Sequence, residues 1–425
     1  MDKKQPKAYF MGWKNVALFF VIMSFIGVVF YSVSIIFPAM LRERGWTRGS
    51  ASLALTLNVL LMGFFAPVIA ISIDRIGNRR TLTTGLMITF IIMLLLYTTT
   101  YNLWMWTVLW GMLAPVGMAF GSFVPIITNL MLWFNIRRAT VMGIVTTGFA
   151  IGGFIAQPLY AWLISATGTW RIGWLANAIV SFIALLLSFS IIEKPADVGQ
   201  YPDGLNPHEN ESGHNRVELN PRTYRSSINW TLKMVFKNPV IWLLFIVNMG
   251  YLQALFLINS HGLLHFTDIG FTPMQAASIL GVIILSSGIA GIPMGVLADR
   301  IEPRWIIAFA MAMMCFMFLA LWKASNLVSL VAAGSVFGFC YGTIGLVTTT
   351  MIGNYFGPES FPKINGVLGP MGTITSAIVP LIAGLIADRT GNYDMIFAFI
   401  SIVLLCGSGC GFLLKPPILK REVSL

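Results

Sequence analysis

Long apolar runs separated by short polar breaks make up most of the chain. Each run is about 20 to 30 residues long, which is enough for an α-helix to cross a hydrocarbon core about 30 Å thick. The alternation of runs and breaks predicts an all-α membrane protein with twelve spanning helices. These lie near residues 15–40, 50–73, 81–100, 103–133, 140–165, 171–192, 238–260, 274–298, 304–323, 326–352, 364–387 and 393–414.

One long polar segment interrupts this series. Residues 193–237 are rich in Pro, Asn, Glu and Ser, and such a composition cannot bury a core of its own. The segment separates six predicted helices from six. We therefore expect a six-helix bundle over residues 1–192, a cytoplasmic linker over 193–237 and a second six-helix bundle over 238–425.

The composition excludes a water-soluble protein. Hydrophobic residues make up 57% of the chain and charged residues only 10%, whereas soluble domains have about 25% charged residues. The sequence contains no nucleophile–base constellation and no metal-type spacing, so we expect no enzyme activity, no metal and no cofactor. Four cysteines lie inside apolar runs without CxxC spacing and are interpreted as core residues: Cys315, Cys340, Cys406 and Cys410.

The positive charges indicate the topology. Assigning successive loops to alternate sides places 21 of the 27 Lys and Arg residues on the side that also receives both termini and the linker. Cytoplasmic loops carry this excess, so both termini are expected in the cytoplasm of a multi-pass protein of the cell membrane, the inner membrane of a bacterium. The net charge of +11 then reflects topology. We expect the lipid bilayer and a small solute as partners, no nucleic acid, and a monomer.

An internal repeat relates the two halves. Asp74 and Arg75, after the second predicted helix, recur 225 residues later as Asp299 and Arg300, after the eighth. A second echo relates Gly168 to Gly391 at an offset of 223. Two similar halves in the same orientation are one of the repeat types of secondary transporters.

The repeated loops carry a motif of the form G-x-L-x-D-R-x-G-R-R. The residues that match it are Asp74, Arg75, Gly77, Arg79 and Arg80 in the first half and Gly295, Leu297, Asp299, Arg300 and Arg304 in the second. In this motif the chain resembles the major facilitator superfamily, which implies two six-helix bundles around a central pore. Asp74, Arg75, Asp299 and Arg300 then either gate the cytoplasmic side through charge-assisted contacts between helices or serve as interface anchors and topology signals.

Two shorter motifs narrow the resemblance. Gly45-Trp46-Thr47-Arg48 and Trp133-Phe134-x-x-Arg137-Arg138-Ala139 are similar to segments of bacterial members of the branch that holds the monocarboxylate porters and oxalate:formate antiporters. Carriers of that branch commonly place a basic residue in the eighth helix. In those carriers it follows an acidic residue four positions earlier, and these acidic and basic positions fall near Ser287 and Gly291 here. The lysine that oxalate:formate antiporters carry in the eleventh helix is also absent.

The interior of the predicted membrane region has no charged residue, since all acids and bases fall in loops, tails or helix ends. His261, and less strongly His265, are the titratable candidates for proton coupling; the alternative is an interfacial histidine bonded to a neighbouring loop. Neutral polar and aromatic residues of the pore-lining helices are the candidates for substrate binding, or alternatively contacts between helices. They are Tyr31, Asn58, Ser122, Asn248, Gln253, Asn259, Ser286, Ser287, Phe339, Cys340, Tyr341 and Thr373.

The sequence thus predicts a secondary active transporter for a small organic solute. The resemblance favours a monocarboxylate-like or aromatic acid moved with protons by rocker-switch alternating access. The alternative is efflux of a neutral or amphiphilic compound, which the uncharged interior and the many aromatic residues would suit.

Overall fold

The computed structural model describes residues 10–134, 138–204, 224, 226, 230–298, 300–357 and 360–417. Within these ranges every regular element is helical. Most are α-helices; η1 is a π-helix, and η2 and η3 are short 3-10 helices. The elements are α1 (Gly12–Arg44), α2 (Arg48–Phe64), α3 (Ala66–Ile76), α4 (Asn78–Thr99), α5 (Leu103–Trp106), η1 (Thr107–Leu113), α6 (Ala114–Phe120), α7 (Phe123–Trp133), α8 (Arg138–Thr167), α9 (Arg171–Ser188), η2 (Pro195–Val198), η3 (Pro202–Gly204), α10 (Leu232–Lys237), α11 (Pro239–Asp268), α12 (Pro273–Ile289), α13 (Gly291–Ala298), α14 (Pro303–Trp322), α15 (Leu327–Phe356), α16 (Phe361–Ala377), α17 (Val379–Thr390) and α18 (Asp394–Leu413).

The helices confirm a multi-pass membrane fold. Among the described residues, ten helical segments are long and apolar enough to cross a membrane, and α2 with α3, bent by 50°, makes an eleventh. The remaining predicted span, 274–298, is occupied by the 17-residue α12 followed by α13. These two predicted spans are therefore broken or sharply bent, which hydropathy alone does not distinguish from continuous helices.

The backbone repeats at the offset found in the sequence. α2 ends at Phe64 and α12 ends at Ile289, which lie 225 positions apart. The turns before these two helices also correspond, because Gly45 and Gly270 both have positive φ, at 64° and 104°, a conformation that glycine adopts without steric cost. The two halves therefore share the break as well as the loop motif.

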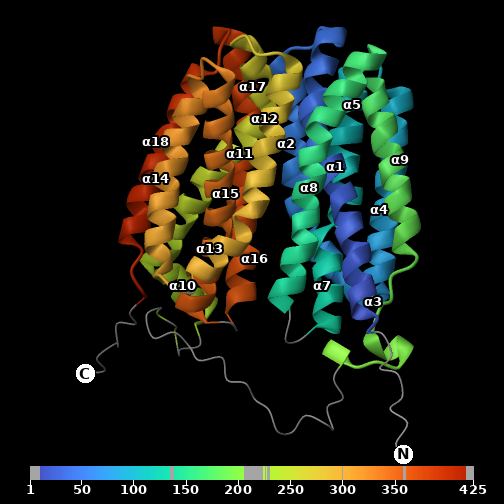
Figure 1. Cartoon of the computed structure of the whole chain (residues 1–425), viewed down its shortest axis with the longest axis vertical. Helices are drawn as coiled ribbons and strands as arrows, with labels where there is room; N and C mark the ends of the chain where they lie inside the picture. Colours follow the sequence, from blue (N-terminus) through green and yellow to red (C-terminus); the bar gives the residue numbers. More distant parts are fainter. Residues whose placement is uncertain are drawn as a thin grey trace, which may run out of the picture.

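The elements fall into two groups that lie side by side (Figure 1). α1–α9 form one group and α11–α18 form the other. We call the end of the molecule that holds α3, α7, α10 and α13 the linker end, and the end that holds α5 and α17 the far end. α10 belongs to the segment expected to be a linker, and nearby Trp230 is buried with only 4% of its surface exposed. Part of that segment therefore packs against the second group.

The two groups pack closely at positions where a glycine leaves no side chain between the helices. α8 contacts α12, and α2 contacts α16 and α17. A Cβ atom added at Gly384 would lie 2.8 Å from the backbone of Arg48, and one added at Gly281 would lie 3.0 Å from the carbonyl oxygen of Phe154. These contacts permit the backbones of opposite groups to approach closely without an intervening side chain.

Candidate functional site

A cavity of about 260 Å³ lies between the two groups of helices. This volume lies slightly below the roughly 300–1,000 Å³ of typical ligand pockets, so the cavity suits only a small solute. Among the described residues its wall contains no charged side chain. The wall consists of Ile26, Phe30, Tyr31, Met62, Met118, Ser122, Phe123, Phe149, Leu255, Phe256, Asn259 and Tyr341.

Aromatic rings form much of this wall. The rings of Phe30, Tyr31 and Phe149 contact one another with centroids 5.1–5.7 Å apart, and Phe123 contacts Phe149 at 5.0 Å. Edge and tilted contacts of this kind are favourable for aromatic pairs. The cavity therefore has a largely aromatic wall that suits an apolar or aromatic solute.

Three polar side chains of the same wall keep unused hydrogen-bonding capacity. Across the described part of the chain, no hydrogen bond is recorded for the side chains of Tyr31, Asn259 or Tyr341. A buried polar group without a partner costs free energy, and a bound solute or cavity water can provide that partner. These groups are the cavity's available donors and acceptors.

A second, smaller cavity of about 40 Å³ adjoins the first and shares Phe30, Phe256 and Asn259 with it. Asn58 lies in its wall and donates from Nδ2 to the carbonyl oxygen of Trp110 at 2.8 Å. That carbonyl belongs to the π-helix η1. The amide of Asn58 therefore has a structural partner in addition to its place at the cavity.

Five of the twelve predicted binding residues line these two cavities: Tyr31, Asn58, Ser122, Asn259 and Tyr341. The other seven do not line either one: Asn248, Gln253, Ser286, Ser287, Phe339, Cys340 and Thr373. Gln253 donates to the carbonyl oxygen of Thr375 at 3.4 Å, and the hydroxyls of Ser287 and Thr373 donate to carbonyls of their own helices at 2.7 and 3.0 Å. In this conformation the side chains of Gln253, Ser287 and Thr373 therefore bond to backbone carbonyls within or between helices.

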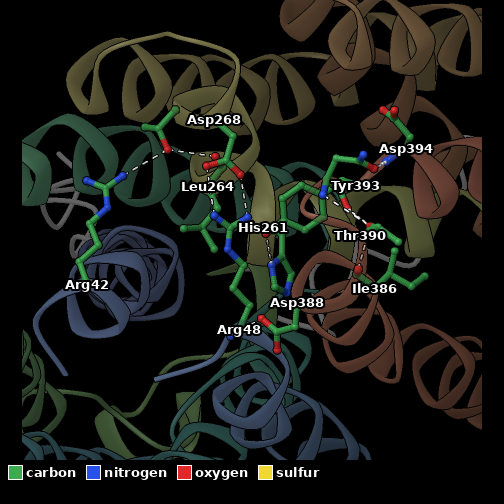
Figure 2. Close-up of polar contacts among 12 residues, drawn as sticks. Arg42, Arg48, His261, Leu264, Asp268, Ile386, Asp388, Thr390, Tyr393 and Asp394 are labelled. Carbon is green, nitrogen blue, oxygen red and sulfur yellow. Dashed lines mark hydrogen bonds and ion pairs between the residues drawn. The ribbon is translucent and has the colours of Figure 1, made fainter. Parts of the chain in front are cut away.

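A charged cluster joins the two groups at the far end. Arg48, the first residue of α2, makes a two-pronged ion pair with Asp268 of α11 at 2.7 and 3.1 Å. It also donates to the hydroxyl of Tyr393 at 2.9 Å. The carboxylate of Asp388 accepts the backbone N–H groups of Arg48 and Gly49 at 2.9 and 2.7 Å, which places a negative charge at the positive end of α2. Figure 2 shows these side chains converging.

His261 belongs to this far-end cluster and has only 1% of its surface exposed. Its Nε2 lies 2.9 Å from the carbonyl oxygen of Pro380 and its Nδ1 lies 3.0 Å from the hydroxyl of Tyr393. A carbonyl can only accept, so the geometry assigns the proton of a neutral ring to Nε2. Nδ1 then accepts from Tyr393, whose oxygen accepts in turn from Arg48. The second candidate, His265, is also buried, and its ring contacts that of Tyr393.

All recorded hydrogen bonds between described residues of the two groups lie at this far end. At the linker end, Asp74 and Arg75 are exposed on α3 with no recorded ion pair among the described residues. Arg300 is likewise exposed, and Asp299 lies outside the described residues. A carboxylate that the sequence did not single out, Glu193, instead accepts the backbone N–H groups of Asn78 and Arg79 at 2.6 and 2.8 Å.

Sequence reasoning missed two kinds of functional residue. The apolar wall residues Met62, Phe123 and Phe256 look like any other apolar position of a membrane helix, so no signal in the sequence marks them. The partners of Arg48 lie more than 200 residues away in the chain, at Asp268, Asp388 and Tyr393. Only Arg48 itself had a signal, in the Gly-Trp-Thr-Arg motif.

Within the described chain, no group of three or more His, Cys, Asp or Glu residues is arranged to hold a metal ion.

Comparison with known proteins identifies the family. The sequence profile of the Major Facilitator Superfamily matches residues 17–286 and 263–424. The chain belongs to the Major Facilitator Superfamily. A nucleoside transporter, NupG, has a similar structure with a TM-score of 0.70 over 94% of this chain and 99% of that chain, at 14% sequence identity.

Several curated relatives are monocarboxylate transporters. Monocarboxylate transporter 13 of Rattus norvegicus is 24% identical, with 92% of this chain and 85% of that protein covered. Monocarboxylate transporter 13 of Bos taurus is also 24% identical, with 83% of this chain and 78% of that protein covered. The aspyridones efflux protein apdF of Emericella nidulans is 23% identical, with 70% of this chain and 56% of that protein covered. The resemblance to the monocarboxylate branch is thus confirmed, and this superfamily member is a membrane transporter of small molecules and not an enzyme.

Proposed function

We propose that the protein moves a small monocarboxylate-like or aromatic acid across the cell membrane together with protons, as a monomer. The two six-helix units, residues 1–192 and 238–425 joined by the linker 193–237, would rock about the central cavity. The carrying observation is that cavity. It lies between the two groups, is rich in aromatic rings and is lined by Tyr31, Asn259 and Tyr341, whose side chains have no recorded hydrogen bond to another described residue.

The distribution of contacts between the groups supports alternating access. Recorded hydrogen bonds between the described parts of the two groups gather at the far end, around Arg48. Positive-inside bias supports a cytoplasmic linker end, and with that orientation this conformation is closed on the outside. Opening the outside requires the pair between Arg48 and Asp268 to break. Ion contacts made by Asp74, Arg75, Asp299 and Arg300 would then hold the cytoplasmic side.

Proton coupling is supported by the charge of the substrate and by the place of His261. Moving a carboxylate inward against a negative-inside potential costs about 2.3 kcal/mol of free energy per charge per 100 mV. A proton that moves with the carboxylate cancels this cost. Protonation of His261 would add an N–H at Nδ1. Tyr393 could then no longer donate to that nitrogen and would have to redirect its proton, which links the charge on the ring to the far-end cluster.

Efflux of a neutral or amphiphilic compound is the second candidate. The observation that favours it is the absence of a charged side chain among the described residues that line the cavity. An uncharged solute needs no counter-charge, and the aromatic wall would bind it by apolar contact alone.

Transport by purified protein in sealed vesicles decides between these functions. We expect radiolabelled benzoate or lactate to accumulate when the outside is acidic, and to accumulate with no dependence on an imposed membrane potential because the proton and the carboxylate cancel. Uptake that responds to the potential and not to the pH gradient would contradict proton coupling. Transport of uncharged aromatic compounds with no transport of any monocarboxylate would replace the proposal by efflux.

A further inference from the structure

A cavity of about 290 Å³ lies at the far end of the second group, apart from the central cavity. Its wall comes from the end of α11, the connection between α14 and α15, and the connection between α17 and α18. Unlike the central cavity, it is lined by charged side chains, those of Asp268, Lys323 and Asp394. The side chains of Lys323 and Asp394 are 65% and 54% exposed, so water reaches this far-end cavity.

His265 lies in the wall of the far-end cavity, in the last turn of α11. Only 5% of its surface is exposed, and its Nε2 is buried without a hydrogen-bond partner among the described residues. The carbonyls of Leu321 and Trp322 approach the ring but do not bond to Nε2. A buried polar group without a partner costs free energy, so His265 has hydrogen-bonding capacity that this conformation does not use.

His261, one turn earlier on the same face of α11, has no such spare capacity. Its Nε2 lies 2.9 Å from the carbonyl oxygen of Pro380, and its Nδ1 lies 3.0 Å from the hydroxyl of Tyr393. The Tyr393 ring contacts both histidine rings, with centroids 5.4 and 5.9 Å apart. The two histidines are therefore neighbours with different environments, and only His265 lines the cavity that water reaches.

The charged and titratable groups around His265 come from three parts of the second group. Asp268 follows it by three positions on α11, so the two side chains share one face of the helix. Asp394 lines the same cavity and lies 3.6 Å from Nζ of Lys323, and Tyr393 is the remaining titratable neighbour. The two carboxylates attract a positive charge on the ring and the ammonium group repels it. The C-terminal end of the α11 dipole also attracts a cation in its last turn.

Asp268 is already bonded to a cation of the other group. Arg48 holds its carboxylate with a two-pronged contact at 2.7 and 3.1 Å, and this contact has to break when the two groups separate at the far end. A positive charge on His265 would stay beside Asp268 during that separation, because both residues belong to α11. Protonation of His265 therefore lowers the cost of leaving Asp268 without Arg48.

We propose that His265 is a proton-binding site whose occupation opens the outer side of the transporter. A proton from the outside water binds the neutral ring, which then has an N–H group at both nitrogens and a positive charge that takes the place of Arg48 beside Asp268. The proposal rests on the proposed function in one respect, that Arg48 and Asp268 close the outer side. It requires no substrate, and it leaves the proton that moves with the substrate to His261.

The direction of the pH effect follows from this competition. The open form binds one proton more than the closed form, so the open form gains population as the outside pH falls. One bound proton limits the change to at most about tenfold per pH unit. An acidic outside would then both drive the uptake of a proton and turn the central cavity outward.

Labelling of a cysteine placed at Ser122 by an impermeant reagent, applied outside intact cells without substrate, measures this opening. The rate at each pH is divided by that of the same cysteine in Arg48→Ala, because this ratio cancels the pH dependence of the thiol reaction itself. We expect the ratio to rise as the outside pH falls from about 8 to about 5, the range in which histidine usually changes charge. The ratio should not depend on pH in His265→Gln, whereas His261→Gln should retain the dependence.

Asp394→Asn tests the same site without changing the buried ring. The side chain is 54% exposed, and asparagine keeps an oxygen for the indole N–H of Trp322, which donates to Asp394 at 2.6 Å. The variant removes one negative charge from the cavity wall, so the protonated ring is less stable. We expect the midpoint of the pH dependence to move to lower pH by about half a unit, as one partly exposed charge contact predicts. This result does not depend on whether His265→Gln folds.

Four outcomes would overturn the assignment. A wild-type ratio that does not change with pH would exclude a proton-operated opening, and a His265→Gln variant that retains the dependence would exclude this histidine. Loss of the dependence in His261→Gln would place the proton on that ring, and an unchanged midpoint in Asp394→Asn would exclude the far-end cavity. Labelling that Arg48→Ala does not increase at any pH would instead refute the closing role given under the proposed function. A protein that opens with acid but transports no monocarboxylate would refute only the proposed substrate.

Discussion

The far-end cluster and the central cavity are two of the places where the halves of this transporter meet, and they use polar groups in opposite ways. At the far end, Arg48 is paired with Asp268 and with Tyr393, and Asp388 is bonded to the start of α2. In the cavity, Tyr31, Asn259 and Tyr341 have no recorded partner among the described residues.

The difference has a physical basis. The contact that holds the two halves closed has its charges paired and bonded, although the side chains of Arg48 and Asp268 are still 26% and 37% exposed. A site that binds a solute must instead leave donors free, since a donor already bonded within the protein has little to gain from a ligand. The cluster and the cavity can therefore be separated by substitutions that affect one and not the other.

His261→Gln should have the largest effect. Glutamine can still make hydrogen bonds but cannot carry a proton, so we expect accumulation driven by a pH gradient to be lost while exchange of labelled for unlabelled substrate continues. Uptake and exchange in vesicles measure the two activities separately. A mutant that retains pH-driven accumulation would show that the neutral acid enters by itself, and that His261 is only a structural member of the cluster.

Arg48→Ala should open the far end. The change leaves Asp268 without its cation, so we expect labelling of a cysteine at Ser122 by an impermeant reagent from outside to rise by about tenfold, as the loss of roughly 1.4 kcal/mol from the closed form predicts. Arg42→Ala is the matched control, because Arg42 has a single recorded bond, to Thr267 at 3.3 Å, and should change labelling little. Equal labelling of both variants would contradict a closing role for Arg48.

Asn259→Ala and Asn248→Ala compare a cavity amide with an amide on the same helix that does not line the cavity. We expect Asn259→Ala to weaken substrate affinity by about fivefold, in line with one hydrogen bond of roughly 1 kcal/mol. Asn248 is 8% exposed and lies close to Gly372 of α16, so its replacement should lower the melting temperature and leave affinity nearly unchanged. The reverse pattern would place the substrate elsewhere along α11.

Asp74→Asn should have the smallest effect of the four. Asp74 is exposed in this conformation, so its replacement should not affect folding or surface expression. If it contributes to ion contacts in the opposite conformation, turnover should fall by about two- to threefold, as expected for one partly exposed contact. Unchanged transport in Asp74→Asn, Asp299→Asn and the double variant would leave both residues as interface anchors.

Much of the architecture could be predicted because it depends on local properties of the chain. The length and apolarity of each run set the number and place of the helices, and loop charges predict their orientation. The Asp-Arg motif and its repeat identified the superfamily before any contact was known. The absence of interior charges also predicted a cavity wall without charged side chains.

Only the tertiary structure decided which polar residues face the cavity. Asn248 and Asn259 lie on the same helix and look alike in the sequence, but only Asn259 lines the cavity. The reason is that membrane helices such as α11 are apolar around their whole circumference, so periodicity does not reveal which side faces a pore. The pairing of Arg48 with Asp268, 220 residues apart, and the break before Phe123 likewise depend on how helices meet in space, and neither leaves a mark on the local pattern of apolar residues.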